Sequence, residues 1–508
     1  MGYPKKLLRL KPIKGIAADT PPHEVGPQFY TNGRNVQFRR GFASRIMGNR
    51  EVYGTLPVDA FRLLNALMDG VNYWLVFGAD EIHALETVNA TNVTPAAGLT
   101  AITQPWEWAA TLLNGVPVAT NGIEAPHYWD GNTTNDFVEL PDWPAGTSCK
   151  SIVAFRFHLF ALDIDGPGGH FDSQILWSDA AAPGAVPSSW TPTAANEAGD
   201  AQLGDTPGPV LMGLPLRGSL MLYKPHSTYS VDYVGGNEKF SLRTLFTSSG
   251  ALTRHAACDV NGQHLVVSDG DIILTDGTNR RSIGQARMKD FLFSQLDQDN
   301  YENLFSIYYP ARGEVWVCFP ESGETLATLA LVYDVANDAF GIRELPDVAA
   351  AAVGIVNDAV VSDAWDDDSD AWESDSSGWN TANFSAASSS LVLGAGDLMI
   401  LQDTQDAVSL AASLGRHDLT FGAPERVKFV KRLHVLSESS GPLFVRVGAR
   451  MTPGDSTAWS PEVELTSPDQ IVNTFAQGRY ISVELRSEAA STWTVTGIEI
   501  EAELRGYH

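Results

Sequence analysis

The sequence predicts an all-β protein, an irregular β-propeller of about six blades followed by a C-terminal β-sandwich-like domain. Three observations carry this prediction. The 508 residues include 45 glycines and 28 prolines, a composition typical of chains built from short strands and turns. A two-stranded pattern with Gly-containing turns recurs along the first two-thirds of the chain. Strict apolar–polar alternation then marks the last part.

Residues 1–50 form a basic N-terminal segment, which we expect to be a docking arm that includes a first strand. The segment has ten cations and two acids and carries +8, so the rest of a chain with net charge −27 carries −35. Nucleic-acid-binding proteins neutralise phosphates with clustered Lys and Arg, and this segment alone has such a cluster. An equally good interpretation is a basic arm that docks on an acidic neighbour. The candidate contact residues are Lys5, Lys6, Arg9, Lys11, Lys14, Arg34, Arg39 and Arg40.

Residues 51–357 contain six similar hairpins, which predict the propeller. Three clear copies begin at Asp69, Asn114 and Asn261, and looser copies begin at residues 156, 217 and 312. Periods of about 40 to 50 residues with Asx-Gly turns are typical of four-stranded blades, because a small twisted sheet buries both faces only between neighbours. The alternative is a β-sandwich with unrelated sheets, since such hairpins are common.

Residues 358–390 differ in composition and are expected to form an acidic loop or an insertion of hairpins. Asp358 to Trp379 holds eight acids and no cation, with tryptophans at 365, 372 and 379. Asp and Ser are poor helix formers, which argues against a helical seam. The order of acids also departs from that of a calcium-binding loop, so a solvated loop is the favoured interpretation.

Residues 391–508 alternate cleanly and predict the sandwich-like domain. In the last strand Ile498, Ile500 and Ala502 alternate with acids. One sheet face is therefore expected in the core, and the opposite face is expected to carry an acidic ladder. The ladder consists of Glu499, Glu501 and Glu503.

No recognised catalytic, metal or cofactor motif is present in the sequence, so we expect no enzyme activity, no metal site and no cofactor. The chain lacks nucleophile-elbow, zinc-protease, phosphate-loop and dinucleotide-binding motifs. A glycosidase needs only two carboxylates about 5 to 10 Å apart. The 61 acids therefore leave a carbohydrate-binding or glycoside-hydrolysing propeller open as an alternative.

The cysteines and the apolar runs bear on the compartment. Cys149, Cys258 and Cys318 are odd in number and far apart, which favours folding in a reducing compartment over a disulfide framework. The longest apolar run, Val348 to Val356, has nine residues, whereas a bilayer-spanning helix needs about 20. We expect no membrane-spanning segment and no secretory signal.

The segment Pro21 to Gly41, followed by FASRIMG, resembles the N-terminal signature of tail nozzle proteins of short-tailed bacteriophages, the tail tubular protein B type. In that family a Pro-rich lead-in runs into an Asn-Val-x-Phe-Arg-x-Gly strand, matched here by Asn35, Val36, Phe38, Arg39 and Gly41. Further similar segments cover nearly the whole chain. They are Ile175 to Thr193, Leu214 to Gly236, Ala327 to Pro346, the Trp-Asp heptads and Gly478 to Gly506.

This resemblance implies a structural protein of the virion tail, assembled in the host cytoplasm. Six copies are expected to form a ring below a tail adaptor protein, with possible contacts to tail fibres or spikes. Double-stranded DNA is expected to pass through the ring without stable binding, since an acidic lining does not retain phosphates. The basic segment is then the expected contact with the adaptor or a neighbouring subunit, and the Glu ladder and the loop from Asp358 to Asp375 are candidate lumen faces. Another head–tail connector or minor structural protein is the remaining alternative.

Overall fold

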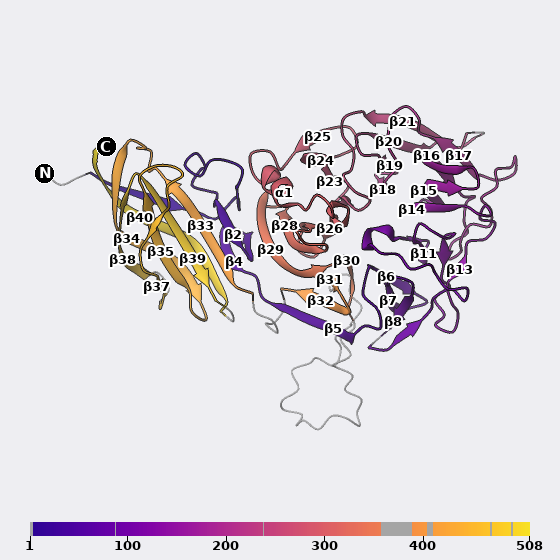
Figure 1. The fold of residues 1–508 in the computed structure, drawn as a ribbon, viewed down its shortest axis with the longest axis horizontal. Helices are drawn as coiled ribbons and strands as arrows, with labels where there is room; N and C mark the ends of the chain where they lie inside the picture. The colour runs from indigo at the N-terminus through magenta and orange to yellow at the C-terminus, as the bar shows by residue number, and fades with distance from the viewer. Residues whose placement is uncertain are drawn as a thin grey trace, which may run out of the picture.

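The computed structural model describes residues 4–86, 88–236, 238–356, 389–403, 410–467, 470–488 and 491–507. The protein is all-β, with 53% of residues in strands and 3% in helices, as the sequence predicts. The helical elements among the described residues are short: α1 (Lys289–Gln295), η1 (Pro105–Glu107) and η2 (Tyr301–Asn303). Figure 1 shows two parts side by side, a larger group of small sheets and a smaller pair of long-stranded sheets.

The larger part contains seven four-stranded antiparallel sheets, six of them built from consecutive strands. The six are β6 (Arg62–Met68), β7 (Val71–Phe77), β8 (Ile82–Leu85) and β9 (Ala90–Asn92); β10 (Ala109–Leu113), β11 (Val116–Thr120), β12 (His127–Tyr128) and β13 (Val138–Glu139); β14 (Ser148–Phe155), β15 (His158–Gly166), β16 (Gly169–Trp177) and β17 (Gly199–Gln202); β18 (Met212–Leu216), β19 (Ser219–Tyr223), β20 (Thr228–Tyr233) and β21 (Phe240–Phe246); β22 (Ala257–Asp259), β23 (His264–Ser268), β24 (Asp271–Thr275) and β25 (Arg280–Ser282); and β26 (Phe305–Tyr309), β27 (Glu314–Phe319), β28 (Ala327–Asp334) and β29 (Ala339–Val348).

The six hairpins expected from the sequence are all present, and each consists of the second and third strands of one sheet. The Asx-Gly pairs at which the clear copies begin form the turn before the hairpin, between the first and second strands of the sheet. Asp69 and Gly70 have φ of 49° and 85°, and Asn114 and Gly115 have φ of 52° and 90°. Two-residue hairpin turns of type I′ need positive φ at both central positions, which Asn, Asp and Gly tolerate best.

A seventh sheet raises the number above the expected six. It consists of β30 (Ala350–Ile355), β31 (Ser389–Ala395), β32 (Leu398–Gln402) and β5 (Asn49–Thr55). The sequence conceals it for two reasons: its fourth strand comes from the N-terminal segment, and the connection from β30 to β31 contains the acidic Trp repeats. That acidic segment lies outside the described residues. The domain boundaries expected after residues 50 and 390 fall within two strands of this sheet, β5 and β31.

Neighbouring sheets of the larger part pack face against face. The first strand of each sheet contacts the first strand of the next, and β30 contacts β6. Trp74 of the first sheet shares an apolar cluster with Val52 and Met399 of the seventh. Trp129 of the second sheet packs edge-on against Tyr73 of the first, with ring centroids 5.1 Å apart. Each sheet is thus covered on both faces, and Figure 1 shows the seven sheets around a common centre.

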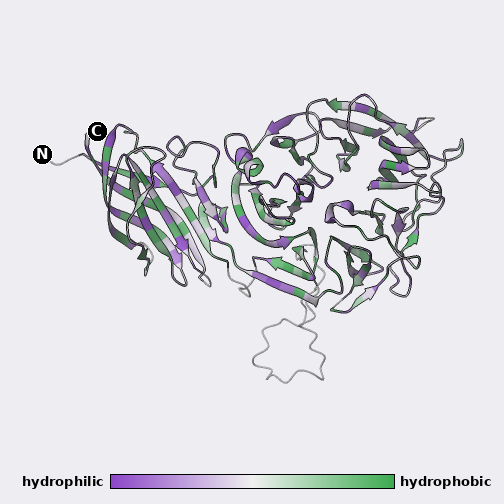
Figure 2. Cartoon of the chain, viewed as in Figure 1, coloured by the Kyte–Doolittle hydropathy of each residue, from purple (hydrophilic) through white to green (hydrophobic). Residues whose placement is uncertain are grey.

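The smaller part consists of two six-stranded sheets that share one apolar cluster, in which Ile498 and Ile500 of one sheet pack with Val483 and Leu485 of the other. Hydrophobic and hydrophilic residues alternate along these strands (Figure 2), as expected for residues 391–508. The first sheet contains β1 (Lys5–Leu10), β3 (Val36–Arg39), β4 (Phe42–Arg45), β34 (Arg426–Ser439), β38 (Gln470–Gly478) and β40 (Trp493–Tyr507). The second contains β2 (Asn32–Arg34), β33 (Ala412–Leu419), β35 (Phe444–Arg450), β36 (Ala458–Trp459), β37 (Val463–Glu464) and β39 (Tyr480–Ser487).

The N-terminal segment is therefore part of three sheets. β1 and β4 pair with β40, β2 pairs with β33, and β5 pairs with β32. The chain enters the smaller part, crosses to the larger part in β5, and returns after β32. This path connects the two parts twice, and it places the expected docking arm against the C-terminal strands of the same chain.

We expect Val52→Asp, in the middle of β5, to lower the free energy of unfolding by at least about 3 kcal/mol, because the carboxylate would be buried without a partner. Val52 is 3% exposed between Trp74 and Met399. Glu51→Asp places the same residue type on the exposed neighbouring position and is the matched control, expected within about 0.5 kcal/mol of the parent protein. Urea unfolding measures both. Equal stability of the two variants would show that β5 does not contribute to the seventh sheet.

Candidate functional site

A cavity of about 620 Å³ lies where the first strands of the seven sheets meet. Residues of β6, β10, β14, β18, β22, β26 and β30 all border it. Its volume is that of a small-molecule site, since such sites enclose about 300–1,000 Å³. We call it the central cavity.

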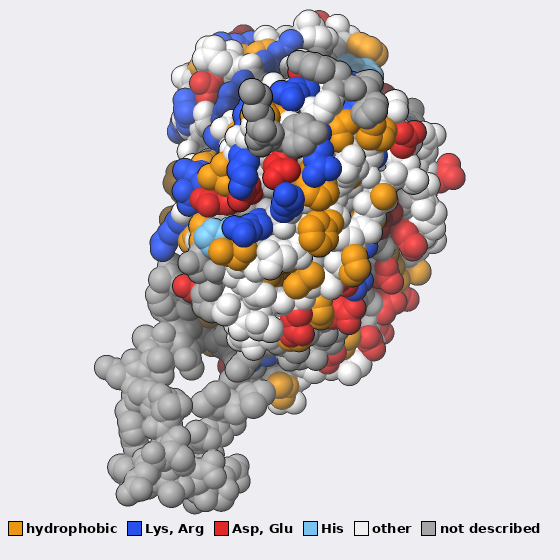
Figure 3. Space-filling view, turned by 90° about the vertical axis from the view of Figure 1, so that its left-hand side faces the viewer, with side chains coloured by type: hydrophobic (Ala, Val, Ile, Leu, Met, Phe, Trp, Pro, Cys, Tyr) orange, Lys and Arg blue, Asp and Glu red, His pale blue; other side chains and the backbone are white. Residues whose placement is uncertain are grey.

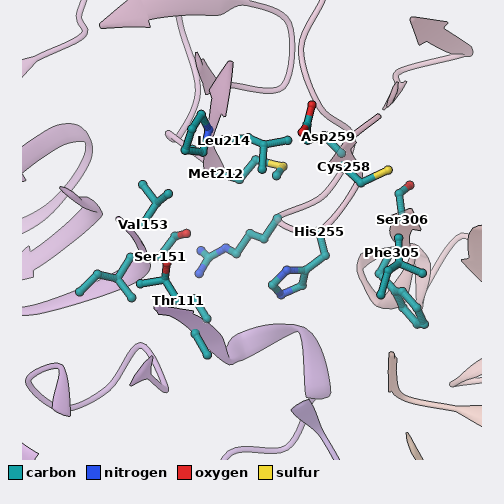
Figure 4. A pocket seen from close by; sticks show the side chains of 18 of the residues that line it. Thr111, Ser151, Val153, Met212, Leu214, His255, Cys258, Asp259, Phe305 and Ser306 are labelled. Atoms are coloured by element: carbon teal, nitrogen blue, oxygen red, sulfur yellow. The ribbon is translucent and has the colours of Figure 1, made fainter. Parts of the chain in front are cut away.

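Most residues that line the central cavity are apolar, and several polar groups lie among them. Val153, Met212, Leu214 and Phe305 contribute apolar surface, and Figure 4 shows the side chain of His255 pointing into the space between them. The hydroxyl-bearing residues are Thr111, Ser151, Ser306 and Tyr308, and the charged residues of the wall are Arg62, Arg254 and Asp259.

Arg62, at the start of β6, contacts His255 from the loop before β22. The Arg62 Nη1–H group donates to His255 Nδ1 at 3.3 Å, and His255 Nε2–H donates to the carbonyl oxygen of Trp106 at 3.2 Å. Since a guanidinium only donates, these contacts assign the neutral tautomer with its proton on Nε2. Burial holds the pKa of His255 well below its usual value, and the charge of Arg62 lowers it further.

Arg254, the neighbour of His255, is paired with a carboxylate. Its Nη2 lies 3.0 Å from Asp163 Oδ2, its Nη1 donates to the Lys150 carbonyl at 3.0 Å, and its guanidinium lies over the Trp106 ring at 5.4 Å. Asp163 is 2% exposed. Burial raises the pKa of this carboxyl, and the charge of Arg254 opposes that rise. A buried carboxylate is stable in a protein when a cation compensates it, as Arg254 does here.

Arg62 differs from Arg254 in having no such compensation. Among the described residues no carboxylate forms an ion pair with Arg62, and burial alone lowers the pKa of its guanidinium to about 10. The acid in the cavity wall, Asp259, is exposed, and its Oδ1 accepts from the Gly262 N–H at 3.1 Å. The central cavity thus presents an uncompensated positive charge.

These cavity residues were not predicted from the sequence, although the sequence contains a signal for them. Arg62 precedes the turn residue Asp69 by the same number of positions as Arg254 precedes Asn261. Equivalent positions in a repeated hairpin occupy equivalent places in the assembled sheets. A search for charged residues repeated at one hairpin position would therefore have brought the two arginines together.

The structure brings two of the expected sites together on one sheet face. β1 runs antiparallel beside β40, so Lys5 lies opposite Glu503 and Arg9 opposite Glu499. Lys5 Nζ is 2.6 Å from Glu501 Oε1, and Arg9 Nε is 3.5 Å from Glu499 Oε1. The basic segment thus lies against an acidic strand of its own chain.

The Glu ladder is neutralised from both sides. Lys431 Nζ lies 2.9 Å from Glu503 Oε1, and Arg505 lies 3.6 Å from the same carboxylate. Arg432 lies opposite Glu501 in the register of β34 and β40. Five cations therefore surround three carboxylates, and Figure 3 shows Lys and Arg side chains gathered on this end of the molecule. The ladder alone does not supply a negative lumen face.

The other expected contact residues fall into two groups. Lys14 pairs with Asp338 at 3.2 Å, Arg34 with Glu344 at 3.3 Å and Arg39 with Glu314 at 3.2 Å. The remaining three, which are exposed and form no ion pair with a carboxylate in the described part of the chain, are Lys6, Lys11 and Arg40.

No protein family matches this chain, and no curated protein matches it. Within the described ranges, no group of three or more His, Cys, Asp or Glu side chains is arranged to hold a metal ion. The helices of those ranges are all too short or too polar to cross a lipid bilayer.

We expect Arg254→Gln to lower the free energy of unfolding at neutral pH by about 3–5 kcal/mol, because it leaves the buried Asp163 carboxylate with only the half-exposed His170 imidazole beside it, 3.2 Å away. This deficit should shrink as the pH falls, since protonated Asp163 no longer needs a cation. Urea unfolding at pH 7 and pH 4 measures both effects. The matched control is Arg243→Gln, whose side chain is 64% exposed and which should change stability by less than about 0.5 kcal/mol. A deficit that is independent of pH would contradict the pairing.

We expect Lys5→Gln to raise the pKa of Glu501, because the hydrogen bond from Lys5 holds that pKa below its ordinary value of 4.5. A lowered carboxyl pKa stabilises the fold above the pKa of the unfolded chain, and this contribution disappears as the pH falls. Titration of ¹³C-labelled glutamate carboxyls by NMR, assigned with Glu501→Gln, measures the shift. Lys11→Gln should leave the Glu501 titration unchanged. The same Glu501 pKa in the parent and in Lys5→Gln would argue against the cross-strand pair.

Proposed function

We propose that this chain is a structural protein of a short-tailed phage virion, a tail nozzle of the tail tubular protein B type. We infer that the seven small sheets form an irregular β-propeller, closed by β5, and that the two six-stranded sheets form a β-sandwich. Six copies form a ring below a tail adaptor, and the genome leaves through the centre of that ring. The protein works as a passive conduit and not as an enzyme.

The observation that carries this proposal is the structural role of the residues on which the resemblance rests. Asn35 has a φ of 57°, and its Nδ2 donates to Glu344 Oε2 and to the Ala411 carbonyl, both at 2.8 Å. Its Oδ1 accepts from the Glu344 N–H at 3.0 Å. These bonds join β29 of the larger part to the start of the smaller part. A signature whose side chains hold two domains together suits a scaffold protein.

Arg39 has a similar joining role. Its Nη2 lies 3.2 Å from Glu314 Oε1, and its Nε lies 3.7 Å from Asp334 Oδ2. Both acids belong to the sixth sheet, whereas Arg39 lies on β3 of the smaller part. Val36 and Phe38 of the same strand are 1% and 4% exposed and pack in the cluster that the two parts share. A fixed relation between the two parts is what a rigid ring subunit requires.

The size of the central cavity favours a channel between copies over a channel within one copy. A cavity of about 620 Å³ accepts a small molecule but not a duplex, whose grooves alone are about 6 and 12 Å wide. Passage of DNA therefore needs a wider opening, which a ring of copies supplies. The net charge of −27 suits such an opening, because phosphates are not retained by a negative wall.

A second candidate function, a carbohydrate-binding or glycoside-hydrolysing tail propeller, is favoured by one observation. The central cavity has the size of a ligand site and holds hydroxyl and cationic side chains on apolar walls. Such a lining is typical of small-molecule sites. In this alternative the protein would engage a polysaccharide of the host surface.

We expect native mass spectrometry of the purified protein to give a mass close to six times that of the 54.9 kDa chain, and the adaptor's mass is added to this value when the two are purified together. Negative-stain images of the same sample should show rings with a central opening. A monomer that binds or cleaves polysaccharide would favour the second candidate. Rings with a central opening too narrow for duplex DNA would contradict the nozzle.

A further inference from the structure

We propose that the central cavity binds a small oxyanion, a phosphate or carboxylate group, through the guanidinium of Arg62. The proposal is independent of the tail function, because it concerns a ligand inside one copy of the chain. It rests on the charge balance of the cavity, on the donors that Arg62 leaves available, and on the way in which its neighbours hold it.

The central cavity has one more positive charge than its paired carboxylate compensates. Two guanidiniums, those of Arg62 and Arg254, flank His255, and the Asp163 carboxylate compensates Arg254. His255 accepts a hydrogen bond from Arg62 but adds no negative charge, because it is neutral in the tautomer assigned above. Arg62 is half-buried, and a charge partly withdrawn from water without a counter-charge is unfavourable. Folded proteins keep such a charge where it has a use, and a bound anion would supply the missing partner.

Arg62 has more N–H donors than its side-chain hydrogen bonds in the described part of the chain use. A guanidinium has five N–H groups in a planar fork, and Arg62 gives one hydrogen bond to His255 among the side-chain bonds of the described residues. Arg62 borders the cavity, so an anion there would meet its remaining donors. The fork matches two oxygens of a carboxylate or phosphate, which is the strongest pairing that Arg makes.

The neighbours of Arg62 hold its guanidinium in place before a ligand binds. His255 is fixed at both ring nitrogens, by Arg62 on one side and by the Trp106 carbonyl on the other. Trp106 belongs to η1 and also carries the guanidinium of Arg254 on its ring. Arg62 is therefore held by a rigid group before any ligand arrives, which lowers the entropy lost on binding. Ser151, 7% exposed in the same wall, offers an additional hydroxyl donor.

The experiment uses the full chain in a buffer free of oxyanions at constant ionic strength. Inorganic phosphate and acetate are titrated separately, with chloride as the screening control. We expect the melting temperature to rise with phosphate or acetate concentration and not with chloride, because a ligand of the folded state stabilises it by mass action. ³¹P NMR line broadening of phosphate gives the same dissociation constant directly. A response to phosphate alone, to acetate alone or to both identifies the group that the cavity binds.

Two variants connect the response to Arg62. Arg62→Gln should weaken binding at least about tenfold, since a hydrogen bond to a charged group contributes that much. It should also melt at the same temperature as the parent, or higher, in anion-free buffer, because an uncompensated charge is removed. Arg62→Lys keeps the charge but loses the fork, and should bind with intermediate affinity. Arg243→Gln, at an exposed arginine paired with Asp232 at 3.3 Å, should leave the response unchanged.

Three results would overturn the proposal: no response of the parent protein to either oxyanion, an equal response to chloride, or an undiminished response in Arg62→Gln. If Arg62→Gln does not fold, the comparison of Arg62→Lys with the parent decides, and equal phosphate affinity of the two would reject the site. A sixfold assembly that binds no oxyanion would reject this site and leave the tail function intact. A monomer that binds an oxyanion through Arg62 would reject the tail function and leave this site intact.

Discussion

The pairing of β5 with β32 is the contact on which the larger part depends. A four-stranded twisted sheet has two apolar faces, and each face needs a neighbouring sheet to cover it. Seven sheets in series satisfy this need only if the last covers the first, as the cluster of Trp74, Val52 and Met399 does. The covering sheet is completed by a strand from the start of the chain, from Asn49↔Gln402 to Thr55↔Leu398. The pairing of β5 with β32 therefore supports the packing of the whole series of sheets.

Local patterns were enough to predict most of the fold. Turns such as Asp69-Gly70 and Asn114-Gly115 are specified by the backbone conformations that their residues tolerate, so the six hairpins were visible in the sequence. The alternation at Ile498, Ile500 and Ala502 predicted the buried face of β40 correctly. The seventh sheet was not visible, because its strands come from distant parts of the sequence: β5 precedes the other six sheets, and β30 to β32 follow them. The connection from β30 to β31 also contains the acidic Trp repeats. Non-local pairing of this kind leaves no periodic signal.

The candidate sites were less predictable, since they depend on which strands become neighbours. The basic residues of β1 and the carboxylates of β40 were each identified, yet nothing in the sequence indicated that Lys5 and Glu501 face each other. Their meeting turns two separate charge clusters into one largely compensated face, so a negative wall of the proposed channel must come from other acids of the chain. Arg62 and His255 are 193 positions apart, and only the arrangement of the seven first strands around the central cavity brings them together.

The position of the N-terminal strands also has a consequence for synthesis. β1 pairs with β40, β2 with β33 and β5 with β32, so these three strands find their partners only after most of the polypeptide has left the ribosome. Until then the nascent chain exposes unpaired strand edges, which tend to join with other chains. The lysines of β1 oppose such joining, since charged residues on an edge are a common protection against it. Contacts so distant in sequence also slow folding, which makes the nascent chain a natural client for a chaperone.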